Sequence, residues 1–256
     1  MQDLNQPYVK LEIQNKIGYV TFFHPNSNSL PGSLLRELAT TIESASNSSE
    51  VNVIVLKSAG EKAFCAGASF DELVNITDLE TGDYFFSGFA LVINAIRNSS
   101  KFVIGRVQGK AVGGGVGLAA ACDYTFASTR SDAKLSELAL GIGPFVVGPA
   151  VERKIGTSAF AEMSIDYDWR SAEWAKNKGL YVDIFESTDA LDASVNTLAI
   201  KLANNSPEAM ADLKRVLWEG TENWDTLLFE RAKISGRLVL SEFTKNYINE
   251  FKSKSK

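Results

Sequence analysis

KAVGGGVGLAAACDY, residues 110–124, places four glycines within five positions, directly before a run of small apolar residues. Glycine lets a backbone turn tightly or approach another group closely. The stretch lies between two segments rich in β-branched and aromatic residues, FVIGRVQG at 102–109 and DYTFAS at 123–128. We therefore expect a strand, a tight turn, a short helix and a further strand in this order.

The same alternation extends toward the N-terminus. Two more strand-like segments are IGYVTFF at 17–23 and VNVIVLKS at 51–58. Helical periodicity at 34–45 and 83–98 places apolar residues on one stripe of each segment, so both helices are expected to pack on a sheet. The stripe residues are Leu34, Leu35, Leu38, Ala39 and Ile42 in the first helix and Phe85, Phe86, Phe89, Val92 and Ile96 in the second. The pattern predicts an α/β fold.

From about Ser171 onward the pattern is almost wholly helical. Helix-like segments are SAEWAKNKG, DALDASVNTLAIKLANN, SPEAMADLKRVLWEG and NWDTLLFERAKISGRLVLSEFTKNYINEFK. The last quarter of the chain is therefore interpreted as a helical appendage, which ends in a short lysine-rich tail.

Composition limits the functions that this chain can have. Its 256 residues are 45% hydrophobic, and 26 Lys and Arg against 31 Asp and Glu leave a net charge of −5 without a basic stripe, so nucleic acid is not an expected partner. Cys65 and Cys122 stand far apart and outside any CxxC pair, which argues against a disulfide framework or a zinc site. No signal peptide or membrane-spanning run is evident, so a cytoplasmic protein without a membrane partner is expected.

Few residues suit side-chain catalysis. The single histidine, His24, lies in the turn-like FHPNSN and is interpreted as a solvated turn residue, so a nucleophile activated by histidine would depend on it alone. Asp71 and Glu72 are interpreted as the solvated first turn of a helix. No metal site is expected.

Two stretches of small residues are better candidates: KAFCAGASFDEL at 62–73 and the glycine run itself. Each follows a strand-like segment and precedes a helix, a junction that presents backbone N–H groups at the positive end of a helix dipole. Two such loops that face one point would form an oxyanion hole. The structural alternative is that the glycines only let helix and strand pack closely.

A dinucleotide site is the nearest competing interpretation, because Gly115, Gly117 and Ala120 satisfy G-x-G-x-x-G/A. However, the run does not follow its strand immediately, and the acidic residues Asp132 and Glu137 fall in no strand-like segment. Binding of NAD is therefore not expected.

Four motifs together resemble those of the enoyl-CoA hydratase/isomerase family, the crotonase superfamily. They are HPNSNSL, AFCAGASFDEL, VQGKAVGGGVGLAAACDYTFAS and LSELALGIGP, and the resemblance covers residues 8–185 in order. It implies a crotonase-like spiral of repeated ββα units over residues 1–185, with the CoA site and oxyanion hole, and a helical C-terminal trimerisation part over residues 186–256. A homotrimer or a hexamer built as a dimer of trimers is implied as well.

The resemblance implies an acyl-CoA thioester as substrate, with no cofactor beyond the coenzyme A of that substrate. Carried over by position, the two oxyanion donors are the N–H groups of Ala68 and Gly114. The implied substrate-binding residues are Lys62 as a phosphate contact, Ala63 and Ala66 at the adenine edge, and Gly67, Gly113 and Gly117 in the same loops. Cys65 is interpreted as a packing residue.

The family's hydratases use two glutamates that hold a water molecule and move protons. The second corresponds to Glu137, whereas the first falls on Gly117, which is expected to face the same cavity as Glu137. One carboxylate suffices to move a proton between two carbons, so the sequence favours an isomerase. Hydration with a substitute group, on a methylglutaconyl-CoA-like substrate for example, stays open, as does a non-catalytic acyl-CoA-binding protein.

The acyl group itself is not specified by the motifs. The segments 70–92 and 144–150 are expected to form its pocket, with an apolar lining from Phe85, Phe86, Phe89, Phe145 and Val146.

Overall fold

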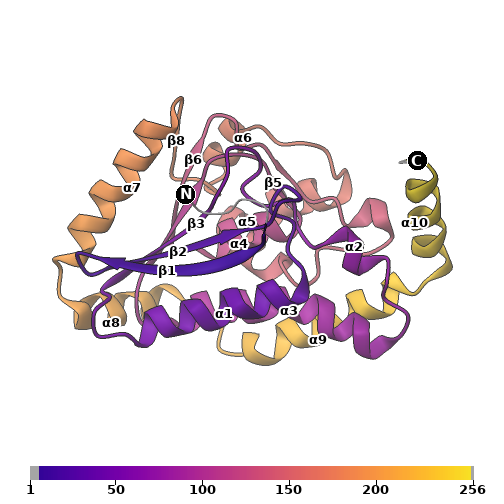
Figure 1. Ribbon diagram of the computed structural model, residues 1–256, viewed down its shortest axis with the longest axis horizontal. Coiled ribbons are helices and arrows are strands. Elements are labelled where there is room, and N and C mark those ends of the chain that lie inside the picture. The colour runs from indigo at the N-terminus through magenta and orange to yellow at the C-terminus, as the bar shows by residue number, and fades with distance from the viewer. Residues whose placement is uncertain (1–5, 255–256) are drawn as a thin grey trace.

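A computed structural model describes residues 6–254, and the side chains of residues 6–250. Its centre is a six-stranded sheet in the order β1-β2-β3-β4-β6-β8, beside a two-stranded sheet that pairs β5 with β7 (Figure 1). The strands are β1 (Tyr8–Gln14), β2 (Ile17–Phe23), β3 (Val53–Ser58), β4 (Val103–Val107), β5 (Ala111–Val112), β6 (Tyr124–Ser128), β7 (Ala133–Lys134) and β8 (Asp183–Phe185). Among the named strands of residues 6–254, β1 and β2 alone pair antiparallel. The predicted α/β class is confirmed.

Ten α-helices and a 3₁₀ turn surround these strands within residues 6–254. They are α1 (Gly32–Asn47), α2 (Phe70–Leu73), α3 (Leu79–Asn98), α4 (Gly114–Ala121), η1 (Leu138–Leu140), α5 (Gly148–Ile165), α6 (Ala172–Asn177), α7 (Thr188–Ala203), α8 (Pro207–Leu217), α9 (Trp224–Val239) and α10 (Glu242–Lys254). Helix α5 has no counterpart in the prediction, and the last predicted helical segment is divided into α9 and α10 by a break at Leu240 and Ser241.

Helices α1, α3 and α9 lie along one face of the sheet (Figure 1). Alternate residues of the buried strands, such as Phe22 and Leu56, point into this layer because side chains of a strand alternate between its faces. Leu35 and Leu38 of the predicted stripe are fully buried there. This layer forms the main hydrophobic core.

The opposite face of the sheet carries a smaller core under α7. Ile17, Val53 and Ile104 from three strands pack against Leu191 and Val195 of the helix. Trp218 and Trp224 instead belong to the main core. The helices after residue 186 therefore pack into the same body as the sheet, and their role in oligomerisation stays a prediction.

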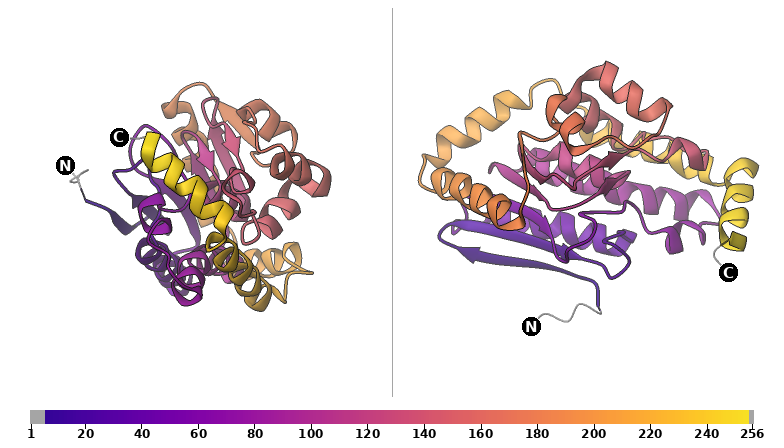
Figure 2. Two further views of the ribbon diagram at one scale, coloured as in Figure 1. Left: turned by 90° about the vertical axis from the view of Figure 1, so that its right-hand side faces the viewer. Right: turned by 90° about the horizontal axis from the view of Figure 1, so that it is seen from above.

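Helix α10 stands at one end of the molecule, next to η1 (Figure 2). A Cβ atom added to Gly141, directly after η1, would overlap the ring of Phe243 on α10. The C-terminal part of the chain thus returns to the region of the predicted site, while the predicted tail lies outside the described side chains.

Candidate functional site

The two predicted loops lie directly against each other. Residues 64–65 run beside 110–112: the N–H of Phe64 donates to the carbonyl of Lys110 at 3.0 Å, and the N–H of Val112 donates to the carbonyl of Cys65 at 2.9 Å. The loop then turns at Gly67, whose φ of +91° favours glycine. A Cβ atom at this position would lie 3.7 Å from the N atom of Gly114. The pairing therefore brings the start of α4 beside the turn that precedes Ala68.

The backbone N–H groups of Ala68 and Gly114 are both free at this junction. In the described part of the chain, neither the N–H of Ala68 nor that of Gly114 donates a hydrogen bond. Gly114 is the first residue of α4, an eight-residue helix that is entirely buried, so its N–H lies at the positive end of the helix dipole. Such a pair can bind an oxygen atom that carries or develops negative charge.

Each glycine of the run is matched to a different neighbour. A Cβ atom at Gly113 would lie 2.9 Å from Oε1 of Glu137, one at Gly114 would overlap the ring of Phe89, and one at Gly115 would overlap the carbonyl of Cys65. Gly113 also has a φ of +52°, in the region that favours glycine. The glycines therefore serve two purposes: they let the loop pack closely against its neighbours, and they leave the space next to the free N–H group of Gly114 open.

Glu137 lies between β7 and η1 with its carboxylate turned inward. Its Oε2 atom is buried and has no hydrogen-bond partner among the described residues, although the residue as a whole is half-buried. Burial raises the pKa of this carboxyl to about 7, and hydrogen bonds from the backbone of Glu137 and Ser136 offset part of the effect. A carboxyl group with such a pKa can both accept and return a proton near neutral pH.

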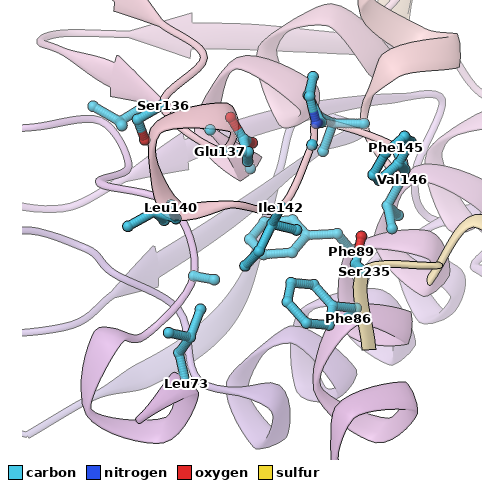
Figure 3. Close-up of a pocket in the computed structure, with 18 of the residues that line it drawn as sticks. Leu73, Phe86, Phe89, Ser136, Glu137, Leu140, Ile142, Phe145, Val146 and Ser235 are labelled. Atoms are coloured by element: carbon cyan, nitrogen blue, oxygen red, sulfur yellow. The ribbon is translucent and has the colours of Figure 1, made fainter. Parts of the chain in front are cut away.

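A cavity of about 310 Å³ joins these groups. Ala68, Gly114 and Glu137 all line it, and Figure 3 shows Glu137 on one side of an otherwise largely apolar space. The apolar lining includes Phe70, Leu73, Phe86, Phe89, Leu140, Ile142, Phe145, Val146 and Val147. Of the residues expected to line the acyl pocket, Phe86, Phe89, Phe145 and Val146 line this cavity, whereas Phe85 is buried beside them and does not.

The other predicted binding residues divide into two groups. Ala66, Gly67 and Gly113 line the cavity. Lys62 is exposed and Ala63 is half-buried, and neither lines it, so their contacts with CoA stay predictions.

The expectation that Gly117 faces the cavity is wrong. A Cβ atom at this position would lie 2.5 Å from Cγ1 of Val147, and Gly117 does not line the cavity. Val147, at the start of α5, occupies the space beside this turn of α4 and presents an apolar side chain to the cavity.

Sequence reasoning missed the polar residues that distant segments bring to the cavity. Ser136 stands next to Glu137, but Ser235 comes from α9 and Tyr247 from α10. No local pattern marks Ser235 or Tyr247, because tertiary packing alone brings α9 and α10 to this place.

The two cysteines are not candidate nucleophiles. Cys65 and Cys122 are fully buried, and this burial raises the pKa of each thiol to about 12. The prediction that Cys65 is a packing residue is confirmed, since its carbonyl and Cβ contact the position of Gly115. His24 is a half-buried turn residue whose Nδ1 accepts a hydrogen bond from the N–H of Asn26 at 3.3 Å.

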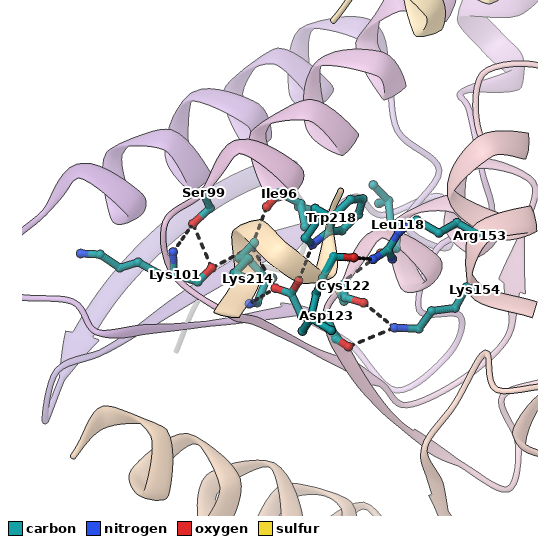
Figure 4. Close-up of polar contacts among 12 residues, drawn as sticks. Ile96, Ser99, Lys101, Leu118, Cys122, Asp123, Arg153, Lys154, Lys214 and Trp218 are labelled. Atoms are coloured by element: carbon teal, nitrogen blue, oxygen red, sulfur yellow. Dashed lines mark hydrogen bonds and ion pairs between the residues drawn. The ribbon is translucent and has the colours of Figure 1, made fainter. Parts of the chain in front are cut away.

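A buried polar cluster anchors the far end of α4 (Figure 4). The Asp123 carboxylate, two residues after the helix, accepts hydrogen bonds from Lys214 Nζ at 2.9 Å, from Trp218 Nε1 at 2.7 Å and from the N–H of Val103 at 2.7 Å. Lys214 is only 1% exposed, and Lys154 Nζ donates to the carbonyl of Cys122 at 2.7 Å. Helix α8 is thereby joined to the end of the helix that carries Gly114.

Residues 6–254 contain no group of three or more His, Cys, Asp or Glu side chains that could hold a metal ion. Within the same range, no helix has the length and apolar character needed to cross a membrane.

Comparison with known proteins gives a consistent result. A family model described as enoyl-CoA hydratase/isomerase matches residues 12–249. The chain is 29% identical to the short-chain-enoyl-CoA hydratase of Clostridium acetobutylicum, over 97% of this chain and 95% of that protein. It is 30% identical to the mitochondrial enoyl-CoA hydratase of Pongo abelii, over 91% of this chain and 78% of that protein.

Solved structures agree with these matches. The crystal structure of an enoyl-CoA hydratase from Mycobacterium avium is 27% identical, covers 99% of this chain and 98% of its own, and has a TM-score of 0.84. The enoyl-CoA hydratase from Bacillus halodurans has a TM-score of 0.88 at 23% identity, with 95% of this chain and 99% of that chain covered, which shows a shared fold.

Proposed function

The chain belongs to the enoyl-CoA hydratase/isomerase family of enzymes that act on acyl-CoA thioesters, and we propose that it shifts the double bond of an enoyl-CoA, with Glu137 as its single acid and base. The carbonyl oxygen of the thioester would be held by the N–H groups of Ala68 and Gly114. The α-protons of a thioester are weakly acidic until the enolate oxygen is stabilised. In enzymes with an oxyanion hole, the loss of one N–H donor typically lowers the rate by about 100- to 1000-fold.

Glu137 then completes the reaction without a second group. Its carboxylate takes a proton from one carbon of the substrate, and the enolate forms under the two N–H donors. The same carboxyl group returns the proton to another carbon, which leaves the double bond in its new place. A pKa of about 7 suits both halves of this transfer, because neither form is strongly favoured at neutral pH.

The observation that carries the proposal is the contact between Gly117 and Val147. The family's first hydratase glutamate would stand at position 117, and Val147 fills the space that any side chain there would need. Hydration requires a water molecule held at the β-carbon, whereas a double-bond shift does not. An apolar side chain at this place therefore favours isomerisation.

Hydration is the second candidate, favoured by the names of the relatives, which are hydratases. Ser136 and Tyr247 also line the cavity, and either hydroxyl is a possible substitute for the missing carboxylate in holding water. Methylglutaconyl-CoA hydratase of Homo sapiens is 31% identical over 76% of this chain, so a branched acyl group stays a possible substrate.

A panel of 2-enoyl- and 3-enoyl-CoA thioesters separates the candidates. Conversion of 3-enoyl to 2-enoyl thioesters without 3-hydroxyacyl product supports the isomerase, and 3-hydroxyacyl product as the main outcome supports the hydratase. Exchange of α-protons in deuterated water, followed on saturated acyl-CoA, tests the enolate step separately. Binding without turnover or exchange would instead indicate a non-catalytic acyl-CoA-binding protein.

We propose the assembly of this protein to be a homotrimer or a dimer of trimers and its location to be the cytoplasm. No cofactor beyond the substrate's own coenzyme A is proposed. Light scattering of the purified protein tests the assembly.

A further inference from the structure

Three hydroxyl groups line the acyl cavity in the described part of the chain, those of Ser136, Ser235 and Tyr247, and the proposed reaction uses none of them. Ser235 on α9 is only 1% exposed and lines the cavity. Figure 3 shows its oxygen atom on the side of the cavity where Phe86, Phe89 and Val146 lie, well apart from Glu137.

The position of Ser235 follows from an unusually close approach of two helices. A Cβ atom at Gly82 on α3 would lie 2.9 Å from the Cα atom of Gly236, and one at Gly236 would lie 2.8 Å from Oδ1 of Asp83. The two backbones therefore nearly touch at this crossing. Ser235, the residue before the crossing, is held among the side chains that α3 sends into the cavity.

The Ser235 hydroxyl has no hydrogen-bond partner among the described residues. Hydroxyls in helices commonly donate to the carbonyl four residues earlier, as Ser164 does to Phe160 at 2.7 Å and Thr197 does to Ala193 at 2.7 Å. Ser235 makes no such bond, and its oxygen is turned to the cavity instead. The oxygen is open to the cavity, and an apolar acyl chain packed there would bury it without a partner, which is unfavourable, so a ligand atom that bonds it is favoured over one that cannot.

We propose that Ser235 determines the acyl specificity of this enzyme, by hydrogen bonding to an uncharged oxygen atom, a hydroxyl or a carbonyl, on the acyl chain. The inference rests on the proposed acyl-CoA site and names the substrate class of that site. Acyl groups with such an oxygen are preferred over hydrocarbon chains of equal length.

A carboxylate on the acyl chain does not fit this wall. Lys134 is the one lysine or arginine that lines the cavity in the described part of the chain, and its Nζ lies 5.8 Å from the ring centre of Trp169, which does not line it. A buried carboxylate requires a cation or several donors, and Ser235 offers a single hydroxyl.

Calorimetry with saturated acyl-CoA thioesters tests the proposal independently of turnover. Hexanoyl-CoA is compared with derivatives that carry one hydroxyl or one ketone at each carbon beyond C3 in turn. At least one derivative is expected to bind the wild-type protein about 10- to 100-fold more tightly than hexanoyl-CoA. In Ser235→Ala this ratio falls to about one, because the partner hydroxyl is gone.

Ser164→Ala is the matched control, since it removes a helical hydroxyl that lies outside the cavity and should keep the wild-type ratio. Ser235→Cys keeps the size of the side chain and weakens the hydrogen bond, so it should lower the ratio even where the alanine variant does not fold. Equal affinities for all ligands in the wild-type protein, or an unchanged ratio in Ser235→Ala, would overturn the proposal.

The proposed reaction is judged separately. A preference that depends on Ser235, without turnover of any enoyl-CoA, supports the role of Ser235 and contradicts the proposed reaction. No binding of any acyl-CoA contradicts both.

Discussion

Gly117 and Val147 share one space: a Cβ atom on the glycine would lie 2.6 Å from Cβ of the valine as well as 2.5 Å from its Cγ1. The two residues are 30 positions apart, yet α4 and α5 meet at this point. The side chain of valine is branched and cannot swing away, so even the smallest addition at position 117 must displace it.

This contact predicts a strong coupling between the two positions. Gly117→Ala should lower the free energy of unfolding by about 1–3 kcal/mol, because it overpacks the contact. In a protein that already carries Val147→Gly, the change Gly117→Ala should lower the free energy of unfolding much less, because the space beside position 117 is then empty. Urea unfolding of the four proteins of the cycle measures the coupling, and additive effects would show that the contact is absent.

Space for a second carboxylate can be made in the same way. Gly117→Glu alone should be destabilised, but Gly117→Glu combined with Val147→Gly should raise the ratio of hydration to double-bond shift on a short 2-enoyl-CoA. Val147→Gly alone is the control. The ratio of products is the quantity to compare, since two neighbouring carboxylates raise the pKa of one another and change the absolute rate. A ratio equal to that of the control would contradict the idea that a carboxylate at position 117 and Glu137 together hold the water needed for hydration.

Glu137→Gln should lower turnover by about 100- to 10000-fold while affinity for saturated acyl-CoA changes little, since glutamine has nearly the same shape and cannot accept the proton. In the wild-type protein, kcat/KM should rise with pH through about pH 7, where the carboxyl group loses its proton, and then level off. Steady-state kinetics across this range provides the test. A variant with wild-type turnover would remove Glu137 from the reaction.

The raised pKa of Glu137 also predicts how stability depends on pH. The folded protein keeps the proton up to about pH 7, whereas the unfolded chain releases it near the ordinary glutamate value of 4.5, so stability falls as pH rises between these values. Glu137→Gln lacks this effect. The variant should gain about 1–3 kcal/mol over the wild-type protein between pH 5 and pH 8. Thermal unfolding at both pH values checks this, with the exposed Glu230→Gln as a control that should show no such gain.

Lys214→Met should be strongly destabilising, by about 3–5 kcal/mol, because it leaves the Asp123 carboxylate buried without its cation. Replacement of both residues, with Asp123→Asn added, should recover part of the loss. Lys233→Met, at an exposed position of α9, is the control. Denaturant unfolding of the three variants tests this, and a loss equal to that of the control would mean that the pair contributes little.

Regular local patterns predicted much of the fold. β2 begins and ends at the predicted residues because its aromatic and β-branched residues alternate between two buried faces. Helix α5 was missed because Gly148, Pro149 and Gly156 read as turn residues, and Gly156 indeed has a φ of +79° within it. β1 was missed because it is an edge strand with several exposed polar residues.

For the site, the sequence predicted the residues that belong to contiguous motifs. Ala68, Gly114 and Glu137 do line one cavity. Ser235 could not be found this way, and for Val147 only its segment 144–150 was predicted and not its contact with Gly117, because each contact joins helices far apart in the chain. Such contacts depend on the packed structure and leave no periodic signal.

The order of strands in the larger sheet has a consequence for synthesis on the ribosome. From β2 to β8, each strand pairs with the strand that precedes it in that sheet, so every new strand finds its neighbour already made as the nascent chain lengthens. The ion pair of Asp123 forms later, since its partner Lys214 is made 91 residues after it. Until α8 is made, the Asp123 carboxylate lacks the cation that pairs with it in the folded protein, so this ion pair can form only after every strand of the larger sheet has been made.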